Sequence, residues 1–250
     1  MGMNIGSRAL YWRKPILVSG EGSSKNIAPL LKEHDVSRVM VVTGRHVGKS
    51  LAPAILESLK AAGIEYYHFS EVEANPSTTT VFKIREAYRD NYCNGFLAIG
   101  GGSPMDSAKA IALLAVSDIE RKNLFDGNIG NKALPMIHIP TTAGTGSEVT
   151  PYAILTRIVM PKIELTTAAA SETSTEAKAG ELVKQSISHH IFPELALVDS
   201  TYLQTASKTG CINTAVDTLA HLVESHLNTN ATPYSRVDSE MGLRTFAKVK

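Results

Sequence analysis

Short apolar runs alternate with segments of helical spacing along most of the chain. Apolar runs rich in β-branched or aromatic residues predict five strands, at 39–42, 64–69, 96–99, 134–139 and 194–198. Apolar positions three or four residues apart predict three helices between them, at 50–62, 76–88 and 103–115. Because strands that alternate with helices pair in parallel, the pattern predicts an α/β fold with a parallel sheet.

The pattern changes toward the end of the chain. The segment 166–179 is rich in Ala, Ser, Thr and Glu and has no clear period, so it forms either a solvated excursion or a polar helix. Beyond residue 200, apolar positions recur at helical spacing only. The sequence therefore predicts two domains, an α/β domain at 1–200 and the beginning of a helical domain at 201–250.

Composition and charge narrow the class of protein. Hydrophobic residues make up 43% of the 250 positions, which is enough for a sizeable core. The 25 Lys and Arg residues nearly balance the 24 Asp and Glu residues, and a net charge of +1 argues against binding to nucleic acid or to an anionic membrane. The apolar runs are also too short to span a bilayer. We therefore expect neither nucleic acid nor membrane as a partner.

The cysteines and the start of the chain indicate a reducing compartment. Cys93 and Cys211 are the two cysteines, and neither belongs to a CxxC motif for zinc or redox chemistry. The first residues lack the continuous apolar core of a signal peptide. We therefore expect the protein to be cytoplasmic.

A glycine-rich turn at 100–106, with the sequence GGGSPMD, is the strongest local signal. It lies between a predicted strand and a predicted helix, and its glycines let the backbone approach a ligand closely. We expect Ser103 as the N-cap, Pro104 at the first helical position and Asp106 in an S-x-x-D capping pattern. A helix N-terminus behind such a turn binds anions, so the turn predicts a pyrophosphate site. The alternative is an ordinary glycine-rich turn.

Two familiar nucleotide-binding fingerprints do not fit. The turn differs from the usual G-x-G-x-x-G of dinucleotide-binding folds. A second glycine-containing stretch, at 44–50, has three residues between its glycines where a P-loop needs four. We therefore reject a P-loop at 44–50.

A hydroxyl-rich loop at 140–148 follows another predicted strand. It contains two glycines and the hydroxyl side chains of Thr141, Thr142, Thr145 and Ser147, which can donate to phosphate or ribose oxygens. Taken alone, a polar loop with a helix cap explains the composition equally well. Paired with the glycine turn, the loop predicts the second wall of a dinucleotide-binding cleft.

Asp217 and His221 stand four residues apart in a predicted helix, so they share one face. A carboxylate and an imidazole placed in this way can bind one divalent cation, although catalytic metals usually have three or more protein ligands. An Asp–His pair at this spacing is also common on helix surfaces. The spacing alone favours the surface pair.

Together these segments resemble the iron-containing, or group III, alcohol dehydrogenase family. The segment 100–109 is similar to the family's GGGSxxDxAK turn, 140–148 to its second signature, and 217–221 to its D-x-x-x-H metal motif. Asn75 and the segment 193–199 also fall at family-like positions. The motifs occur in the family's order, and the resemblance covers nearly the whole chain.

The resemblance implies a dehydroquinate synthase-like architecture. In it, an N-terminal Rossmann-like parallel-sheet domain binds NAD(P)(H), and an all-helical domain supplies the metal. The implied reaction is hydride transfer between the cofactor and a small-molecule alcohol or aldehyde. Fe²⁺, or alternatively Zn²⁺, would polarise the substrate oxygen. Asp217 and His221 would be the first two metal ligands, and the implied assembly is a homodimer.

The turn, the loop and the resemblance together predict twelve cofactor-binding residues: Gly44, Arg45, Asn75, Gly101, Gly102, Ser103, Asp106, Thr141, Thr142, Thr145, Ser147 and Lys184. NAD-preferring members of the family commonly carry an Asp where Gly44 stands. Gly44 leaves room for a 2′-phosphate, and Arg45 can donate to it. We therefore expect NADP(H) to be preferred over NAD(H). The alternative is a plain turn with a solvated arginine.

The chain departs from the family in two respects. The segment 168–182 is longer and less regular than the family's hairpin at that place. The family chain is also longer, and its remaining metal ligands are histidines in later helices, whereas the last histidine here is His226. We therefore expect half a metal site. Two alternatives stay open: a nucleotide-binding fragment or pseudoenzyme, and a glycerol dehydrogenase-like enzyme, although 141–148 fits alcohol dehydrogenases better.

Overall fold

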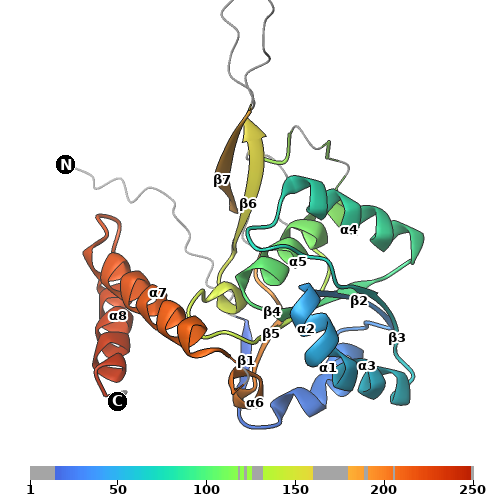
Figure 1. The fold of residues 1–250 in the computed structure, drawn as a ribbon, viewed down its shortest axis with the longest axis horizontal. Helices are drawn as coiled ribbons and strands as arrows, with labels where there is room; N and C mark the ends of the chain where they lie inside the picture. Colours follow the sequence, from blue (N-terminus) through green and yellow to red (C-terminus); the bar gives the residue numbers. More distant parts are fainter. Residues whose placement is uncertain are drawn as a thin grey trace, which may run out of the picture.

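A computed structural model describes residues 15–117, 119–120, 123–125, 132–159, 180–188, 191–204 and 206–248. Its centre is a six-stranded parallel sheet in the order β1-β8-β5-β4-β2-β3 (Figure 1). In that order the strands are Ile16–Ser19, Leu195–Val198, Met136–Pro140, Gly95–Gly100, Arg38–Thr43 and Glu65–Phe69. The parallel α/β prediction is confirmed, and all five predicted strands are present.

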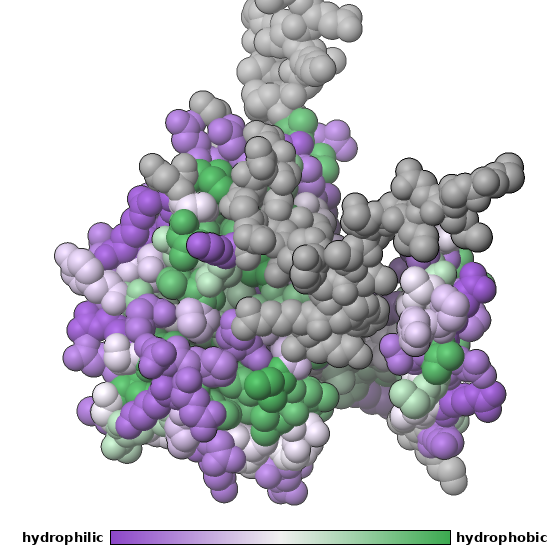
Figure 2. Space-filling view, turned by 180° about the vertical axis from the view of Figure 1, so that it is seen from behind, coloured by the Kyte–Doolittle hydropathy of each residue, from purple (hydrophilic) through white to green (hydrophobic). Residues whose placement is uncertain are grey.

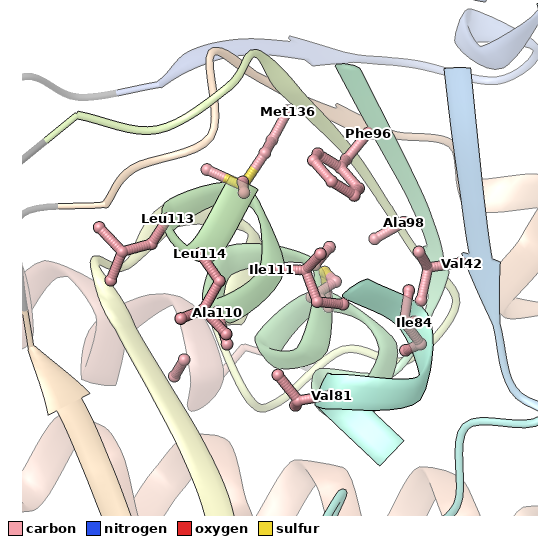
Figure 3. Close-up of a cluster of buried hydrophobic side chains, with 14 of the residues drawn as sticks. Val42, Val81, Ile84, Phe96, Ala98, Ala110, Ile111, Leu113, Leu114 and Met136 are labelled. Carbon is pink, nitrogen blue, oxygen red and sulfur yellow. The ribbon is translucent and has the colours of Figure 1, made fainter. Parts of the chain in front are cut away.

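Helices cover both faces of the sheet. The residues of the inner strands are mostly apolar whether they point to one face or to the other. The helices of this part are α1 (Ile27–Glu33), α2 (Arg45–Ser50), α3 (Ala52–Ala61), α4 (Thr78–Asp90) and α5 (Gly102–Ala115). Val39 and Val41 of β2 face one side with α1 and α3, whereas Met40 and Val42 face α4 and α5. Helix α5 is buried along nearly its whole length between the sheet and α4 (Figure 3).

A two-stranded antiparallel hairpin stands beside the sheet and packs on α5 (Figure 1). It consists of β6 (Tyr152–Val159) and β7 (Glu181–Ser188). Ala153, Leu155 and Ile187 are its buried residues in the core cluster around α5. The sequence analysis did not predict these strands, nor β1 and α1. The predictions for 166–179 and for most of 168–182 lie outside the described residues.

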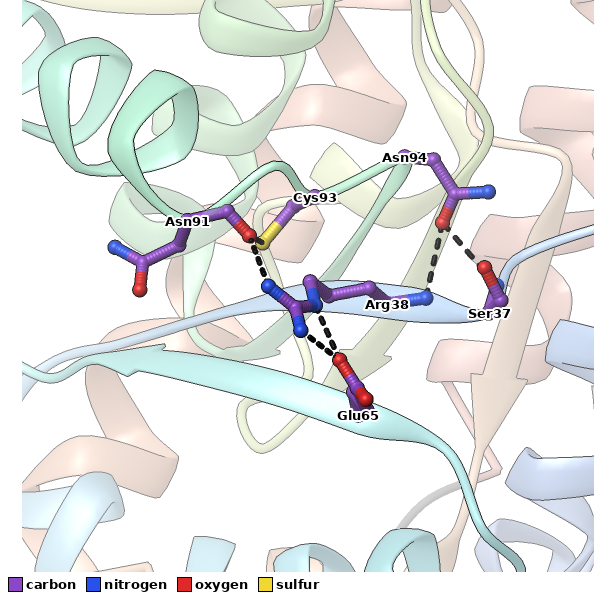
Figure 4. A network of polar contacts seen from close by, with 6 residues as sticks. All are labelled: Ser37, Arg38, Glu65, Asn91, Cys93 and Asn94. Atoms are coloured by element: carbon purple, nitrogen blue, oxygen red, sulfur yellow. Dashed lines mark hydrogen bonds and ion pairs between the residues drawn. The ribbon is translucent and has the colours of Figure 1, made fainter.

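A polar network joins the amino ends of β2 and the edge strand β3 to the segment that precedes β4 (Figure 4). Arg38 on β2 forms an ion pair with Glu65 on β3 and donates to the carbonyl oxygen of Asn91 over 3.0 Å. The side-chain oxygen of Asn94 accepts from the backbone nitrogens of Ser37 and Arg38 at 3.1 and 3.0 Å. This network connects the amino ends of the strands, whereas the two predicted loops lie at the carboxyl ends.

Helices follow the last strand, as the sequence predicted. They are α6 (Ser200–Leu203), α7 (Lys208–Leu227) and α8 (Pro233–Phe246), and α7 packs on α8 (Figure 1). A side chain at Gly242 would meet Leu222, so glycine lets α8 approach α7 closely. None of the described helices is long and apolar enough to cross a bilayer.

Hydrophilic side chains cover much of the described surface seen in Figure 2, with apolar patches between them. Large exposed apolar side chains include Ile16 and Leu17 on the edge strand β1 and Val216 and Leu227 on α7. The exposed apolar residues of α7 recur three or four positions apart and therefore share one face of the helix: Ile212, Val216, Leu219, Val223 and Leu227.

Candidate functional site

The glycine turn and the hydroxyl-rich loop lie next to each other, as predicted. Gly100 ends β4 and Pro140 ends β5, and these two residues are partners in the parallel ladder. The backbone nitrogen of Thr141 donates to the carbonyl oxygen of Gly100 over 2.9 Å. Ligands of open α/β sheets bind outside the carboxyl ends of the strands, which is where both segments are placed.

Helix α5 begins earlier than the sequence predicted. Gly101, in an extended conformation, is the N-cap, so the prediction of Ser103 as N-cap and Pro104 as first helical residue is wrong. No side chain caps this helix end, which leaves its first N–H groups available to an anion. The Ser103 hydroxyl instead accepts the backbone N–H of Asn75 over 3.2 Å.

Backbone conformation favours glycine at position 100 of the turn, and tight contacts favour it at positions 101 and 102. Gly100 has a φ of +148°, which L side chains rarely adopt. A Cβ on Gly101 would lie 3.3 Å from Thr142 Oγ1, and one on Gly102 would lie 3.3 Å from Thr145 Cγ2. The side chains of Thr142 and Thr145 thus lie directly against the glycine turn.

Asp106 ties the turn to the loop and the hairpin, so its predicted capping role is also wrong. Its carboxylate accepts the Ser147 hydroxyl at 2.6 Å and the backbone N–H of Ile154 at 3.0 Å. Lys109, one helical turn later, lies 3.4 Å from the same carboxylate and donates to the carbonyl oxygen of Tyr152 at 2.5 Å. The pair holds three segments of the cleft in one arrangement.

Burial changes the protonation of the groups beneath the cleft. Burial lowers the pKa of the fully enclosed Lys109 to about 8, against the opposing effect of Asp106. Burial also lowers the pKa of His138 on β5 well below its usual value and raises that of Glu148. None of these three residues was predicted to have a role, although Lys109 belongs to the motif at 100–109 and Glu148 to the loop at 140–148.

The hydroxyl-rich loop also contacts helix α7. A Cβ on Gly144 would lie 2.7 Å from the carbonyl oxygen of Thr214, so only glycine permits this approach. The carbonyl oxygen of Gly144 lies 3.2 Å from Nδ1 of His221. Because a carbonyl oxygen only accepts, Nδ1 is the donor in this contact, and Nε2 is the nitrogen left for another partner.

Asp217 and His221 suit a divalent cation. Oδ1 of Asp217 lies 3.8 Å from Nε2 of His221, and both side chains are about half exposed. Tetrahedral ligands at about 2.0–2.2 Å from an ion are roughly 3.4 Å apart, so a small side-chain movement lets both bind one ion. The hydrogen bond to Gly144 orients the imidazole, as partners of metal-binding histidines do. Among the residues that the structure describes, no group of three or more His, Cys, Asp or Glu side chains could hold a metal.

Two cavities flank the glycine turn. The first, about 940 Å³, is lined among others by Asn75, Gly102, Ser103, Asp106, Thr145, Ser147, Lys184, Asp217 and His221. The second, about 780 Å³, is lined among others by Gly101, Thr141, Thr142, His46, Leu51, Leu203 and Cys211. Between them the cavities bring together all the predicted site residues except Gly44 and Arg45.

Gly44 and Arg45 line neither of these cavities. The predicted turn there is the start of helix α2, with Gly44 as its N-cap. The guanidinium of Arg45 lies 3.7 Å from the Glu71 carboxylate, and both side chains are exposed. His46, the next residue, lines the 780 Å³ cavity instead. The sequence alone did not indicate His46, because the side chain that faces the cavity depends on where helix α2 begins.

The chain is similar in sequence to a known protein family and to several characterised proteins. Residues 15–200 match the family described as iron-containing alcohol dehydrogenase. A choline dehydrogenase of Bacillus subtilis (strain 168) is 40% identical over 146 residues, which are 56% of this chain and 36% of that protein. The NAD-dependent methanol dehydrogenase of Bacillus methanolicus is 27% identical over 230 residues, which are 89% of this chain and 54% of that protein.

Solved structures give the same result. An iron-containing alcohol dehydrogenase from Thermotoga maritima superposes with a TM-score of 0.75 at 33% identity. The match covers 94% of this chain and 60% of that one. The chain thus spans about half, or less, of the length of the curated relatives reported above.

Proposed function

Because the chain belongs to the iron-containing alcohol dehydrogenase family, we propose that it forms the cofactor-binding part of a metal-dependent oxidoreductase. The reaction is hydride transfer between NAD(P)(H) and a small-molecule alcohol or aldehyde. One observation carries the proposal: the turn at Gly101 and Gly102 lies between two cavities, and one of them contains Asp217 and His221. A dinucleotide likewise has two ends joined by a pyrophosphate.

The cofactor is placed across the turn. The pyrophosphate binds the free N–H groups at the start of α5, where the helix dipole favours negative charge. The adenosine half occupies the 780 Å³ cavity, and the nicotinamide half occupies the 940 Å³ cavity. Lys184 lines the second of these and adds a positive charge to the cleft.

The metal belongs beside the nicotinamide. Asp217 and His221 would hold it, and the hydrogen bond from Nδ1 of His221 to Gly144 would leave Nε2 for the ion. When bound, Fe²⁺ or Zn²⁺ polarises the substrate oxygen as a Lewis acid. This arrangement divides the chain into a dinucleotide-binding domain at 1–200 and the beginning of a metal-binding domain at 201–250.

NADP(H) is the proposed cofactor in preference to NAD(H). NAD-specific sites use a carboxylate to bind the ribose 2′-hydroxyl, and that charge repels a 2′-phosphate. No carboxylate is found among the described residues that line the 780 Å³ cavity. Gly44, directly after β2, adds no carboxylate. The resemblance further favours a homodimer, and the unpaired cysteines favour a cytoplasmic site of action.

A second candidate is a chain that binds the dinucleotide and performs no chemistry by itself. The two metal-type ligands on α7 favour it, because catalytic metals usually have three or more protein ligands. Titration with NADPH, followed by assays of NADPH oxidation with short-chain aldehydes and added Fe²⁺ or Zn²⁺, separates the two. Binding with metal-dependent turnover supports the first candidate, and binding without turnover supports the second. Absence of NADPH binding would overturn both.

A further inference from the structure

Lys109 on α5 has no exposed side-chain surface, and it is not among the described residues that line the two cavities. Charged side chains are almost never fully buried unless they are paired. A buried ion pair also adds little net stability, because the desolvation of both groups offsets their attraction. The burial of this lysine therefore indicates a role other than stability.

The contacts of Lys109 lead to the start of the hairpin. Its Nζ donates to the carbonyl oxygen of Tyr152 over 2.5 Å and lies 3.4 Å from Oδ1 of Asp106. Oδ2 of Asp106 accepts the backbone N–H of Ile154 over 3.0 Å. Tyr152 and Ile154 are the first and third residues of β6, and both line the 940 Å³ cavity. The Asp106–Lys109 pair thus determines where β6 begins relative to the glycine turn.

The same hairpin brings Lys184 to that cavity. Thr156 of β6 is the ladder partner of Lys184 of β7. Thr156 donates its backbone N–H to the carbonyl oxygen of Pro76 over 2.8 Å and its hydroxyl to that of Asn75 over 3.1 Å. The middle of β6 is therefore held by the segment 75–76, and its beginning is held by Lys109.

We infer that Lys109 is a positioning residue: it does not itself contact the cofactor, and by holding the start of β6 it sets the wall of the cavity that receives the nicotinamide half. This inference rests on the proposed function. A wall that is ordered before binding lowers the conformational entropy lost when the ligand binds. No residue of β6 or β7 is found among the described residues that line the 780 Å³ cavity. Lys109 should therefore affect the nicotinamide half and leave the adenosine half unchanged.

The proton on Lys109 is part of this role, because a charged ammonium donates more strongly than a neutral amine and balances the Asp106 carboxylate. The titratable groups that face Lys109 in the described part of the chain are Asp106 on α5, Glu148 in the loop and His138 on β5. Burial holds the pKa of His138 well below its usual value, so its ring is neutral near pH 8. Burial lowers the pKa of Lys109 to about 8, so this lysine is charged below that pH and neutral above it.

The test compares NADPH with adenosine 2′,5′-bisphosphate, which lacks the nicotinamide half, by isothermal titration calorimetry. For the wild type at neutral pH we expect NADPH to bind more tightly. Lys109→Met removes the charge and the donor but keeps much of the side-chain length. It should weaken NADPH about tenfold and the bisphosphate less than about twofold, because a charge-assisted hydrogen bond to the wall is lost. Lys83→Met, the same change at an exposed position of α4, is the matched control and should change neither affinity.

A second measurement needs no variant. The NADPH affinity of the wild type should fall at least about threefold between roughly pH 7 and 9, as Lys109 loses its proton. The affinity for the bisphosphate should change less than about twofold over the same range, because its site does not include the hairpin. In a folded Lys109→Met variant the NADPH affinity should no longer depend on pH in this range. A merely structural role of Lys109 would weaken both ligands alike.

The outcomes separate this inference from the proposed function. Unchanged NADPH affinity in a folded Lys109→Met variant, or an equal loss for both ligands, would overturn the positioning role. If the variant does not fold, the wild-type pH profiles decide: a fall confined to NADPH supports the role, and a flat or shared profile overturns it. Equal affinity of the wild type for both ligands would also overturn it, while leaving adenosine binding in place. A wild type that binds neither ligand would overturn the proposed function as well.

Discussion

The carbonyl oxygen of Gly144 lies 3.2 Å from Nδ1 of His221, which joins the hydroxyl-rich loop to the metal-binding face of α7. Thr145 and Ser147, directly after this glycine, line the cavity assigned to the nicotinamide. The same short segment therefore shapes the cofactor cleft and orients a metal ligand. A change in the position of the loop is expected to affect both.

Gly144→Ala tests this connection. The added Cβ would lie 2.7 Å from the carbonyl oxygen of Thr214, so the loop must move away from α7. We predict a loss of about 1–3 kcal/mol in the free energy of unfolding, as for other overpacked sites. We also predict at least roughly tenfold weaker NADPH binding, measured by nicotinamide fluorescence. Ala61→Ser, at the exposed end of α3 and outside both cavities, is the control. Unchanged NADPH affinity in Gly144→Ala would show that the loop does not depend on this contact.

Metal binding to this chain should be weak. Asp217 and His221 supply two ligands, and water must supply the rest. In Zn²⁺ titrations we expect an ion that dialysis against a chelator removes, and we expect His221→Ala to abolish its binding. His226→Ala is the matched control on the same helix, because the His226 ring is engaged with the Ser239 hydroxyl at 3.0 Å. Stoichiometric metal that survives the chelator would mean that further residues complete the site.

Cofactor preference should respond to a carboxylate at position 44. In Gly44→Asp the new Cβ would lie 3.2 Å from the carbonyl oxygen of Val72, a contact that a shift of a few tenths of an ångström relieves. The added charge should repel a 2′-phosphate and accept the ribose 2′-hydroxyl. We predict at least a roughly tenfold shift of the NADPH to NADH affinity ratio toward NADH. An unchanged affinity ratio would show that position 44 does not determine the preference between NADPH and NADH.

Asp199 links the end of the sheet to the N-terminal segment and should make stability depend on pH. Burial opposes its ionisation, but hydrogen bonds from Ser24, Thr201 and Gly22 outweigh burial and hold the pKa of the Asp199 carboxyl far below its usual value. The folded pKa is thus below the unfolded value of about 3.9. The charged form therefore contributes stability above that pH, and the contribution is lost as the pH falls further.

Asp199→Asn should lower the free energy of unfolding by about 2 kcal/mol at pH 7, because hydrogen bonds to a charged group are weakened. The difference from the wild type should shrink as the pH falls below about 4, as measured by urea denaturation. Asp90→Asn, at the exposed end of α4, is the control. A difference that is the same at pH 7 and pH 3 would show that the charge of Asp199 does not contribute.

The buried strands could be predicted because the apolar pattern of each strand is contained in its own few residues. β2 and β4 are covered by helices on both faces, so they are continuous apolar runs. The hairpin strand β6 alternates buried and exposed residues and is held by contacts with α5. Such strands depend on a distant partner, which the local pattern does not reveal. β1 is a four-residue edge strand with two exposed apolar residues, and it has little pattern of its own.

The site was predictable to the level of segments, and less so at single residues. The two loops were found from their composition. The Asp217–His221 pair was found from its resemblance to the family's metal motif, because spacing alone favoured a surface pair. The N-cap of α5 was predicted at Ser103, whereas it is Gly101, and the Ser103 hydroxyl instead binds Asn75 from another part of the chain. The directions of Arg45 and His46 likewise depend on where α2 begins.

The central claim is that a dinucleotide binds across the turn at Gly101 and Gly102. Titration of the wild type and Gly102→Val with NADPH, followed by fluorescence, tests it most directly. A valine side chain would start 3.3 Å from Thr145 Cγ2 and fill the space over the N–H groups of α5. We predict saturable binding by the wild type and at least roughly tenfold weaker binding by a variant whose circular dichroism is unchanged. A folded Gly102→Val variant that binds NADPH as tightly as the wild type would contradict the account.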